Sequence, residues 1–192
     1  MLIIARHGRT KSNASGLLLG RADPPLDELG EHQAAALAAA LGTVDRVVSS
    51  PLARTRQTAA AFGVDAEIDD RFVELDYGEW DERPVADVPA AVWQQWRSDL
   101  DFAPPGGESI RSLGERVRAG LDELAADAVD QTIVVVSHVS PIKAALAWTL
   151  GVGDEVAWRS FVQPAAVMRI GVSRRSLSLH AFNDTSHLVD LG

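Results

Sequence analysis

Residues 2–8 read LIIARHG, and this stretch joins a short apolar run directly to an arginine, a histidine and a glycine. Four consecutive apolar residues bounded by polar residues are typical of a buried strand. Glycine beyond the histidine is typical of the loop that follows. We therefore predict a strand over residues 2–5 that delivers Arg6 and His7 to one edge of a sheet.

The same arrangement occurs twice more along the chain. Strands are predicted over residues 45–50 and 132–136, and a helix is predicted to open at Pro51 as a first-turn proline. The polar residues at the ends of these elements are Ser49, Ser50, Arg54, Ser137 and His138. Ligands of open α/β sheets bind beyond the carboxyl ends of the strands, so we expect one composite site at this edge.

The remaining pattern alternates strands with helices. Asp27 and Gly42 are suitable start and stop signals for one of these helices. The further elements that we predict are helices over 27–41, 51–62, 89–100, 108–126 and 141–150, and strands over 66–68, 165–171 and 176–182, with a loop and one helical turn between 11 and 25. This alternation predicts an α/β fold of three layers. Its central sheet should be mainly parallel, with helices on both faces and one late antiparallel edge strand. We expect a single domain over residues 1–192, because this length suits one core and no repeat or linker is visible.

Composition excludes several classes of partner. The chain is 46% hydrophobic and 23% charged, as in ordinary globular proteins. No stretch approaches the roughly 18–20 apolar residues of a membrane span, and the first apolar run is too short for a signal peptide. The net charge of −9 argues against binding to nucleic acid or to an anionic membrane. We therefore expect a cytoplasmic protein; its oligomeric state stays open.

The chain has no cysteine, which excludes disulfides, thiolate metal sites and cysteine nucleophiles. The histidines stand at 7, 32, 138, 180 and 187, and none form a helical i, i+4 metal pair. Neither a Gly-x-x-x-x-Gly-Lys nucleotide loop nor a Gly-x-Ser-x-Gly elbow is present. We expect no metal and no cofactor.

Two histidines and two arginines at one sheet edge indicate phosphoryl transfer. A neutral imidazole is a nucleophile, and neighbouring guanidinium groups disfavour its protonated form. Arginine forks bind phosphate oxygens and stabilise the charge of the transition state. Taken alone, His7 is better explained as a structural residue and the arginines as surface charges; only the combination favours catalysis.

Five ordered segments resemble the motifs of the histidine phosphatase (phosphoglycerate-mutase-like) family. They are RHGRT at 6–10, SSPLARTRQTA at 49–59, ELDYGEW at 74–80, PGGES at 105–109 and VSH at 136–138. Asn13 stands where the first motif usually continues to an asparagine. Together the segments span most of the chain.

The resemblance implies a role for each matched residue. His7 is the nucleophile, and Glu74 donates a proton to the leaving group and then serves as base for water. The residues implied in binding the phosphoryl group are Arg6, Asn13, Arg54 and His138. Three acidic neighbours could take the role of Glu74, namely Asp76, Glu79 and Asp81.

The resemblance implies a phosphomonoesterase, of the histidine acid phosphatase type, that hydrolyses a small phosphorylated metabolite through phosphohistidine. The alternatives are a cofactor-dependent phosphoglycerate mutase and a phospho-ligand-binding protein without turnover. The sequence disfavours the second alternative because every catalytic group is present. Against the mutase stands Leu75, where mutases of the family have an arginine that grips the substrate carboxylate.

Two departures from the family pattern concern the substrate. Val139 and Glu82 stand where the family commonly has glycine. We expect residues 79–105 to shape substrate choice, with Arg83 and Arg97 as the cations of that segment. Its aromatic residues, Trp80, Trp93, Trp96 and Phe102, are interpreted as packing residues rather than as a stacking surface.

Overall fold

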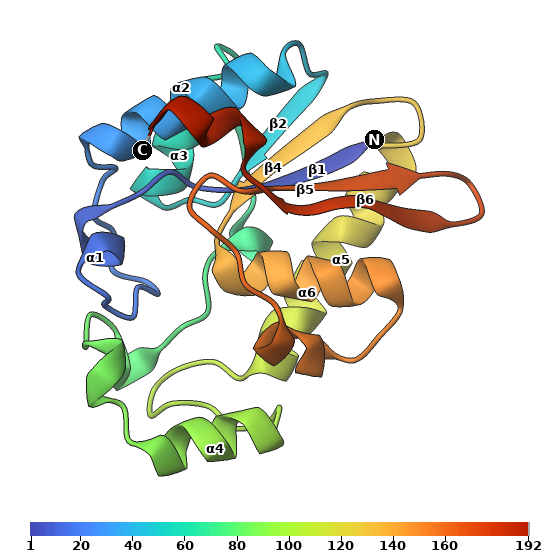
Figure 1. Cartoon of the computed structure of the whole chain (residues 1–192). Helices are drawn as coiled ribbons and strands as arrows, with labels where there is room; N and C mark the ends of the chain where they lie inside the picture. Colours follow the sequence, from blue (N-terminus) through green and yellow to red (C-terminus); the bar gives the residue numbers. More distant parts are fainter. Residues whose placement is uncertain (192) are drawn as a thin grey trace.

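A computed structural model describes residues 1–191, and its centre is a six-stranded sheet in the order β3-β2-β4-β1-β5-β6 (Figure 1). The strands are β1 (Leu2–Arg6), β2 (Arg46–Ser49), β3 (Glu67–Ile68), β4 (Ile133–Ser137), β5 (Val167–Val172) and β6 (Leu177–Asp184). The first four run parallel, whereas β5 pairs antiparallel with both β1 and β6. The predicted α/β sheet with a late antiparallel edge is therefore confirmed.

Helices cover both faces of this sheet. In Figure 1, α2 (Glu28–Leu41) and α3 (Ala53–Ala60) lie above it, and α5 (Ile110–Asp127) and α6 (Val139–Leu150) lie below. The short α1 (Lys11–Ala14) follows β1, and α4 (Ala90–Ser98) lies below the second layer, farthest from the sheet. The 3₁₀ segments are η1 (Asp70–Phe72), η2 (Gly78–Trp80), η3 (Val85–Asp87), η4 (Asp154–Arg159) and η5 (Ser186–Leu191). Among the described residues, none of the helices combines the length and apolar character that crossing a bilayer requires.

Strand β1 shows how the sequence creates two cores. Alternate residues of a strand point to opposite faces, so Leu2 and Ile4 pack among α5 and α6 while Ile3 and Ala5 pack beneath α2 and α3. Each of these four side chains is at most 2% exposed. Burial on both faces explains why the strand reads as a continuous apolar run, and it places β1 at the centre of the sheet.

Two predicted helix starts are wrong, and each concerns a proline. Helix α3 begins at Ala53 with Leu52 as its N-cap, so Pro51 precedes the helix rather than opening it. Helix α6 begins at Val139, two residues before the predicted start at Pro141. Proline is tolerated within a first turn because its missing N–H has no intrahelical partner there. His138 is consequently the N-cap of α6.

The loop after β1 is fastened to the start of α2. The predicted cap is present: Asp27 accepts a hydrogen bond from Gly30 N at 2.8 Å. Its carboxylate also forms an ion pair with Arg9 Nε at 2.8 Å. Arg9 N donates to Gln33 Oε1 at 2.9 Å. Gly30 lies so close that a Cβ atom there would overlap the Arg9 carbonyl oxygen. The glycine therefore allows α2 to press against the loop that carries His7.

This contact predicts the effect of Gly30→Ala. Alanine favours a helix by about 1 kcal/mol over glycine, but here it must push two backbone segments apart. We expect the free energy of unfolding in urea to fall by about 1–3 kcal/mol, as for an overpacked core. The control is Ala39→Gly on the exposed side of the same helix, which should lose only about 1 kcal/mol. A Gly30→Ala protein more stable than the parent would contradict this account.

Candidate active site

His7 is held at the end of β1 in one tautomer. Its backbone N–H donates to Ser137 O and its carbonyl accepts from Ala165 N, both at 3.0 Å. Its ring Nδ1 lies 2.6 Å from the carbonyl oxygen of Gly8. A carbonyl oxygen can only accept, so Nδ1 carries the ring proton and Nε2 keeps its lone pair. The nitrogen that is free to attack a substrate is therefore Nε2.

Burial keeps this imidazole neutral. His7 is 2% exposed, and desolvation lowers its pKa well below the usual value of a histidine. The guanidinium groups of Arg6 and Arg54 lower the pKa further, while the Gly8 carbonyl opposes them. The sequence indicated the arginines as the cause of the neutral state of His7. The structure shows that desolvation lowers the pKa of His7 more than the arginines do. At pH 7 the ring is an uncharged nucleophile.

Arg6 presents an unused donor to this site. Its Nη1 donates to Val162 O at 2.8 Å, but its Nε is buried and has no hydrogen-bond partner within residues 1–191. Burial lowers the pKa of Arg6 to about 10, so the guanidinium stays charged at neutral pH. A buried, unpaired N–H costs free energy. An anion bound here would relieve that cost.

Arg54 is fully buried and fixed by backbone carbonyls. Nη1 donates to Ala22 O and Nη2 to Gly20 O, each at 2.8 Å, and Nε approaches His138 Nδ1 at 3.3 Å. A guanidinium has five N–H donors, and these bonds use three of them. Two donors remain for a ligand, on a group that cannot move without breaking its loop contacts.

His138 completes the group of buried cations and imidazoles. Because its Nδ1 accepts from Arg54, its Nε2 carries the proton and donates to Ser50 Oγ at 2.8 Å. The rings of His7 and His138 lie 5.1 Å apart, edge to face. Desolvation lowers the pKa of His138 well below its usual value, with Arg54 as the next cause. Both histidines are therefore neutral in the folded protein.

Glu74 is buried at the start of α6. Its carboxylate accepts from the backbone N–H groups of Leu75 at 2.7 Å, Val139 at 3.0 Å and Ser140 at 3.1 Å. Two of these donors belong to the first turn of a helix, where the macrodipole favours an anion. This places the carboxylate beside His138, which caps the same helix.

The three acidic alternatives to Glu74 are placed differently. Asp76 accepts from Gly78 N at 2.9 Å and faces Arg21 at the surface, and Glu79 is exposed. Asp81 accepts hydrogen bonds from the backbone N–H groups of Gly20, Arg21 and Ala22. Of the four candidates, Glu74 is the buried carboxylate, and it lies at the start of the helix that His138 caps.

Asn13 lies in α1 and is used in part for local structure. It forms a reciprocal capping box with Thr10, whose backbone N–H and hydroxyl both reach Asn13 Oδ1 at 3.2 and 3.0 Å. Within the described residues, no hydrogen bond joins Asn13 to the arginines or histidines of the site. Its side-chain NH₂ remains available to a ligand, so its role in binding phosphate stays a prediction.

Asp81 positions Arg54 through the loop 20–22. Its carboxylate accepts from the backbone N–H groups of Gly20 at 2.7 Å, Arg21 at 2.8 Å and Ala22 at 2.7 Å. The carbonyls of Gly20 and Ala22 in turn hold the Arg54 guanidinium. We call this arrangement the Asp81 clamp. The sequence offered no signal for it, whereas Ser50 was detectable as a polar residue at a strand end.

The structure therefore gathers Arg6, His7, Arg54 and His138 into one buried cluster with Glu74 beside it, and Asn13 in the neighbouring helix. Within residues 1–191, no group of three or more histidine, aspartate and glutamate side chains is arranged to hold a metal ion. Two guanidiniums with spare donors can bind a phosphate dianion, and a neutral Nε2 can accept a phosphoryl group.

Comparison with known proteins agrees with this chemistry. The sequence model of the histidine phosphatase superfamily (branch 1) matches residues 2–185. A bifunctional protein of Mycobacterium tuberculosis is 36% identical over 176 residues, which cover 86% of this chain and 48% of that protein. The chain thus spans about half the length of this relative. Phosphoserine phosphatase 1 of Hydrogenobacter thermophilus is 33% identical, with 97% of this chain and 93% of that protein covered.

A solved structure shows the same fold. It is a mutant phosphoserine phosphatase from Entamoeba histolytica in complex with phosphoserine, 26% identical to this chain. The two superpose with a TM-score of 0.89 over 98% of each chain. The similarity extends over the sheet, both helical layers and the segment that contains α4.

The neutral histidines predict how stability depends on pH. In the unfolded chain a histidine protonates near pH 6.5, whereas His7 and His138 stay neutral in the folded protein to a much lower pH. The unfolded state therefore binds more protons below pH 6.5, and the free energy of unfolding should fall as the pH drops. Two histidines give a slope that approaches about 2.7 kcal/mol per pH unit, and His187, whose pKa is also lowered by burial, adds in the same direction.

Urea unfolding at pH 7.5, 6.0 and 5.0 measures this slope. In His7→Gln it should be smaller by about 1.4 kcal/mol per pH unit; an unchanged slope would show that His7 titrates normally.

Proposed function

The chain belongs to the histidine phosphatase superfamily, branch 1, and on this premise we propose that it is a phosphomonoesterase that hydrolyses a small phosphorylated metabolite through a phosphohistidine on His7. The observation that carries the proposal is the neutral His7 ring, whose Nε2 keeps its lone pair, together with the neighbouring residue Arg6, whose charge acts on that ring and whose Nε is unpaired within the described residues. A nucleophile and an anion-binding donor at one buried position are the two requirements of phosphoryl transfer to an imidazole.

In the first step, Nε2 of His7 attacks the phosphorus and the bond to the alcohol oxygen breaks. Arg6 and Arg54 bind the non-bridging oxygens and stabilise the charge that spreads over them in the transition state. His138 donates its Nε2–H to the hydroxyl of Ser50, whose own hydrogen is then free to donate to a phosphate oxygen. Glu74, which must be protonated in the substrate complex to act as the general acid, gives its proton to the leaving oxygen.

In the second step, water attacks the phosphohistidine from the side that the alcohol has left. The Glu74 carboxylate removes a proton from that water, the N–P bond breaks, and inorganic phosphate leaves with His7 neutral again. Throughout the cycle Nδ1–H stays bonded to the Gly8 carbonyl, which stabilises the positive charge of the phosphorylated ring. Protons and charges are therefore balanced by residues of this chain.

Hydrolysis is favoured over mutase transfer by the surroundings of Leu75. The side chain is 1% exposed and packs in the apolar core below the sheet, so the arginine that mutases of the family have at this position is missing. With 3-phosphoglycerate as substrate, the product should accordingly be inorganic phosphate and glycerate rather than 2-phosphoglycerate.

The assignment to the acid phosphatase type rests on the lowered pKa of His7, which keeps the nucleophile neutral in mildly acidic solution.

The central test removes the nucleophile. Purified protein should hydrolyse 4-nitrophenyl phosphate, and His7→Ala should lower kcat by at least about 10³-fold. The matched control is His32→Ala, which changes an exposed histidine of α2 and should leave turnover unchanged. Activity should also survive exhaustive chelation, because arginines take the place of a metal. Near-normal turnover by His7→Ala would refute the phosphohistidine mechanism.

A second test isolates the proton donor. An alkoxide is a strong base and needs a proton as it leaves, whereas a nitrophenolate leaves readily without one. Glu74→Gln should therefore slow hydrolysis of an alkyl phosphate by about 10²–10⁴-fold and that of 4-nitrophenyl phosphate only modestly. Glu79→Gln, which changes an exposed carboxylate, is the control. Equal losses on both substrates in Glu74→Gln would exclude it as the acid, and a urea titration would show whether folding had suffered.

A further inference from the structure

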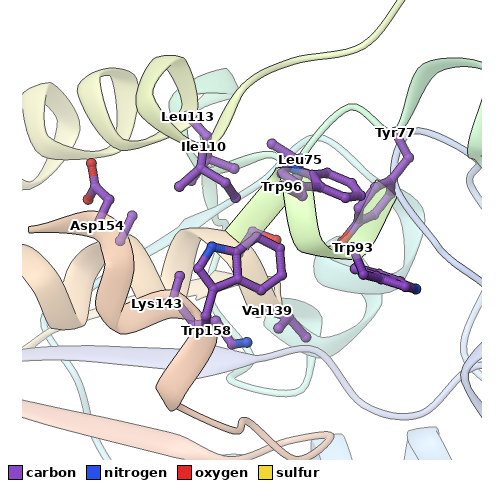
Figure 2. Close-up of a pocket in the computed structure, with 13 residues that line it drawn as sticks. Leu75, Tyr77, Trp93, Trp96, Ile110, Leu113, Val139, Lys143, Asp154 and Trp158 are labelled. Atoms are coloured by element: carbon purple, nitrogen blue, oxygen red, sulfur yellow. The ribbon is translucent and has the colours of Figure 1, made fainter. Parts of the chain in front are cut away.

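A cavity of about 170 Å³ lies between α4, α5, α6 and η4 (Figure 2). Its walls include four aromatic side chains: Tyr77, Trp93, Trp96 and Trp158. Aliphatic side chains from α5 and α6 form much of the remaining lining. The interior is thus mostly apolar and aromatic, as in many sites that bind small molecules.

The cavity adjoins the proposed catalytic acid. Val139 and Ser140 line it, and their backbone N–H groups hold the Glu74 carboxylate. Tyr77 lines it as well and hydrogen-bonds the side chain of Ser140. Because Glu74 is the residue that must face the leaving oxygen, the cavity lies where the alcohol part of a substrate would extend.

Two indole donors in the cavity wall are unused. Trp96 is fully buried and Trp158 is half-buried, and the Nε1 of each has no hydrogen-bond partner within the described residues. An unpaired N–H in apolar surroundings is unfavourable. A ligand that offers an acceptor at this wall would satisfy them.

Lys143 adds a positive charge to the same cavity. Its ammonium is half-buried, and no carboxylate that the structure describes forms an ion pair with it. The charged groups that act on it are Glu74, which attracts it, and Arg6, which repels it. The carboxylate of Asp154 in the cavity wall is already bound to Arg118 at 2.8 Å. The cavity therefore holds a cation and two N–H donors, while its lining carboxylate, Asp154, is already bound to Arg118.

The size of the cavity limits what can enter. A cavity of about 150 Å³ lined by aliphatic and aromatic side chains accommodates benzene. This one is slightly larger, so it has room for one ring and a small substituent. A bulky nucleoside or sugar chain would not fit.

We propose that this cavity is the subsite for the alcohol portion of the substrate, and that it selects phosphomonoesters of ring-sized alcohols that carry a carboxylate. The proposal rests on the proposed function. The ring lies among Trp93, Trp96 and Trp158, and the carboxylate accepts from Lys143 and the indole N–H groups. The cation that grips the substrate comes from α6, not from residues 79–105, whose arginines at 83 and 97 are exposed.

The test compares 4-carboxyphenyl phosphate with phenyl phosphate. We expect kcat/KM to favour the carboxylated substrate, and Lys143→Met to reduce this preference at least tenfold, mainly through KM. Each protein is measured on the same two substrates, so their intrinsic reactivities cancel. Lys11→Met, which changes the only other lysine of the sequence and an exposed one, should retain the preference. Trp158→Phe, which keeps a ring but removes a donor, should raise KM for the carboxylated substrate several-fold.

Failure of the subsite and failure of the proposed function are distinguishable. If glycerol phosphate is hydrolysed in a His7-dependent way but the carboxylate preference is absent, or survives in Lys143→Met, the subsite is refuted and the function stands. If no phosphomonoester is hydrolysed, the subsite is tested by the binding of 4-hydroxybenzoate, measured through the change in tryptophan fluorescence. Saturable binding that weakens at least tenfold in Lys143→Met supports the subsite, and absence of binding overturns it.

Discussion

The hydrogen bond from His7 Nδ1 to the carbonyl of Gly8 is the constraint on which the site depends. It leaves the lone pair on Nε2, and burial of the ring keeps that nitrogen unprotonated. Both conditions require β1 to end in the middle of the sheet, between β4 and β5, under two helical layers. A nucleophile on an outer strand of the sheet would be hydrated and would protonate more readily. The neutral, nucleophilic state of the His7 ring therefore depends on the central position of β1 in the strand order.

The sequence predicted the fold well because the central strands are buried on both faces. Continuous apolar runs such as residues 2–5 and 132–136 leave little choice of structure, and the polar residues that follow them must meet at one edge. The gathering of His7, Arg54 and His138 follows from that rule alone. The family resemblance added the implied roles, including Glu74, whose burial at the start of α6 no periodicity could indicate.

The remaining features depend on contacts between distant segments. Pro51 and Pro141 both suggested helix starts, but the caps at Leu52 and His138 decide where the backbone turns. The Asp81 clamp joins positions about 60 residues apart through backbone N–H groups, which every residue type possesses, so no side-chain pattern marks the loop. The tryptophans interpreted as packing residues do pack, yet two of them, Trp93 and Trp96, also line a cavity, and only three-dimensional placement reveals that double use.

The Asp81 clamp also has a consequence for how such a protein can diversify. Its carboxylate stands where the acidic segment gives way to the stretch that contains α4, and it fixes the loop that holds Arg54. Residues 82–85 are hydrogen-bonded to residues 16–18, just before that loop, so the stretch that can be exchanged without disturbing the phosphate-binding arginine follows them, from Ala86 to Pro104, and contains Trp93 and Trp96 of the aromatic walls. Grafts or natural insertions that keep Asp81 inherit a working phosphate site. Those that replace it must rebuild the loop, so the clamp marks the boundary between the part of the chain that can vary with the substrate and the part that cannot.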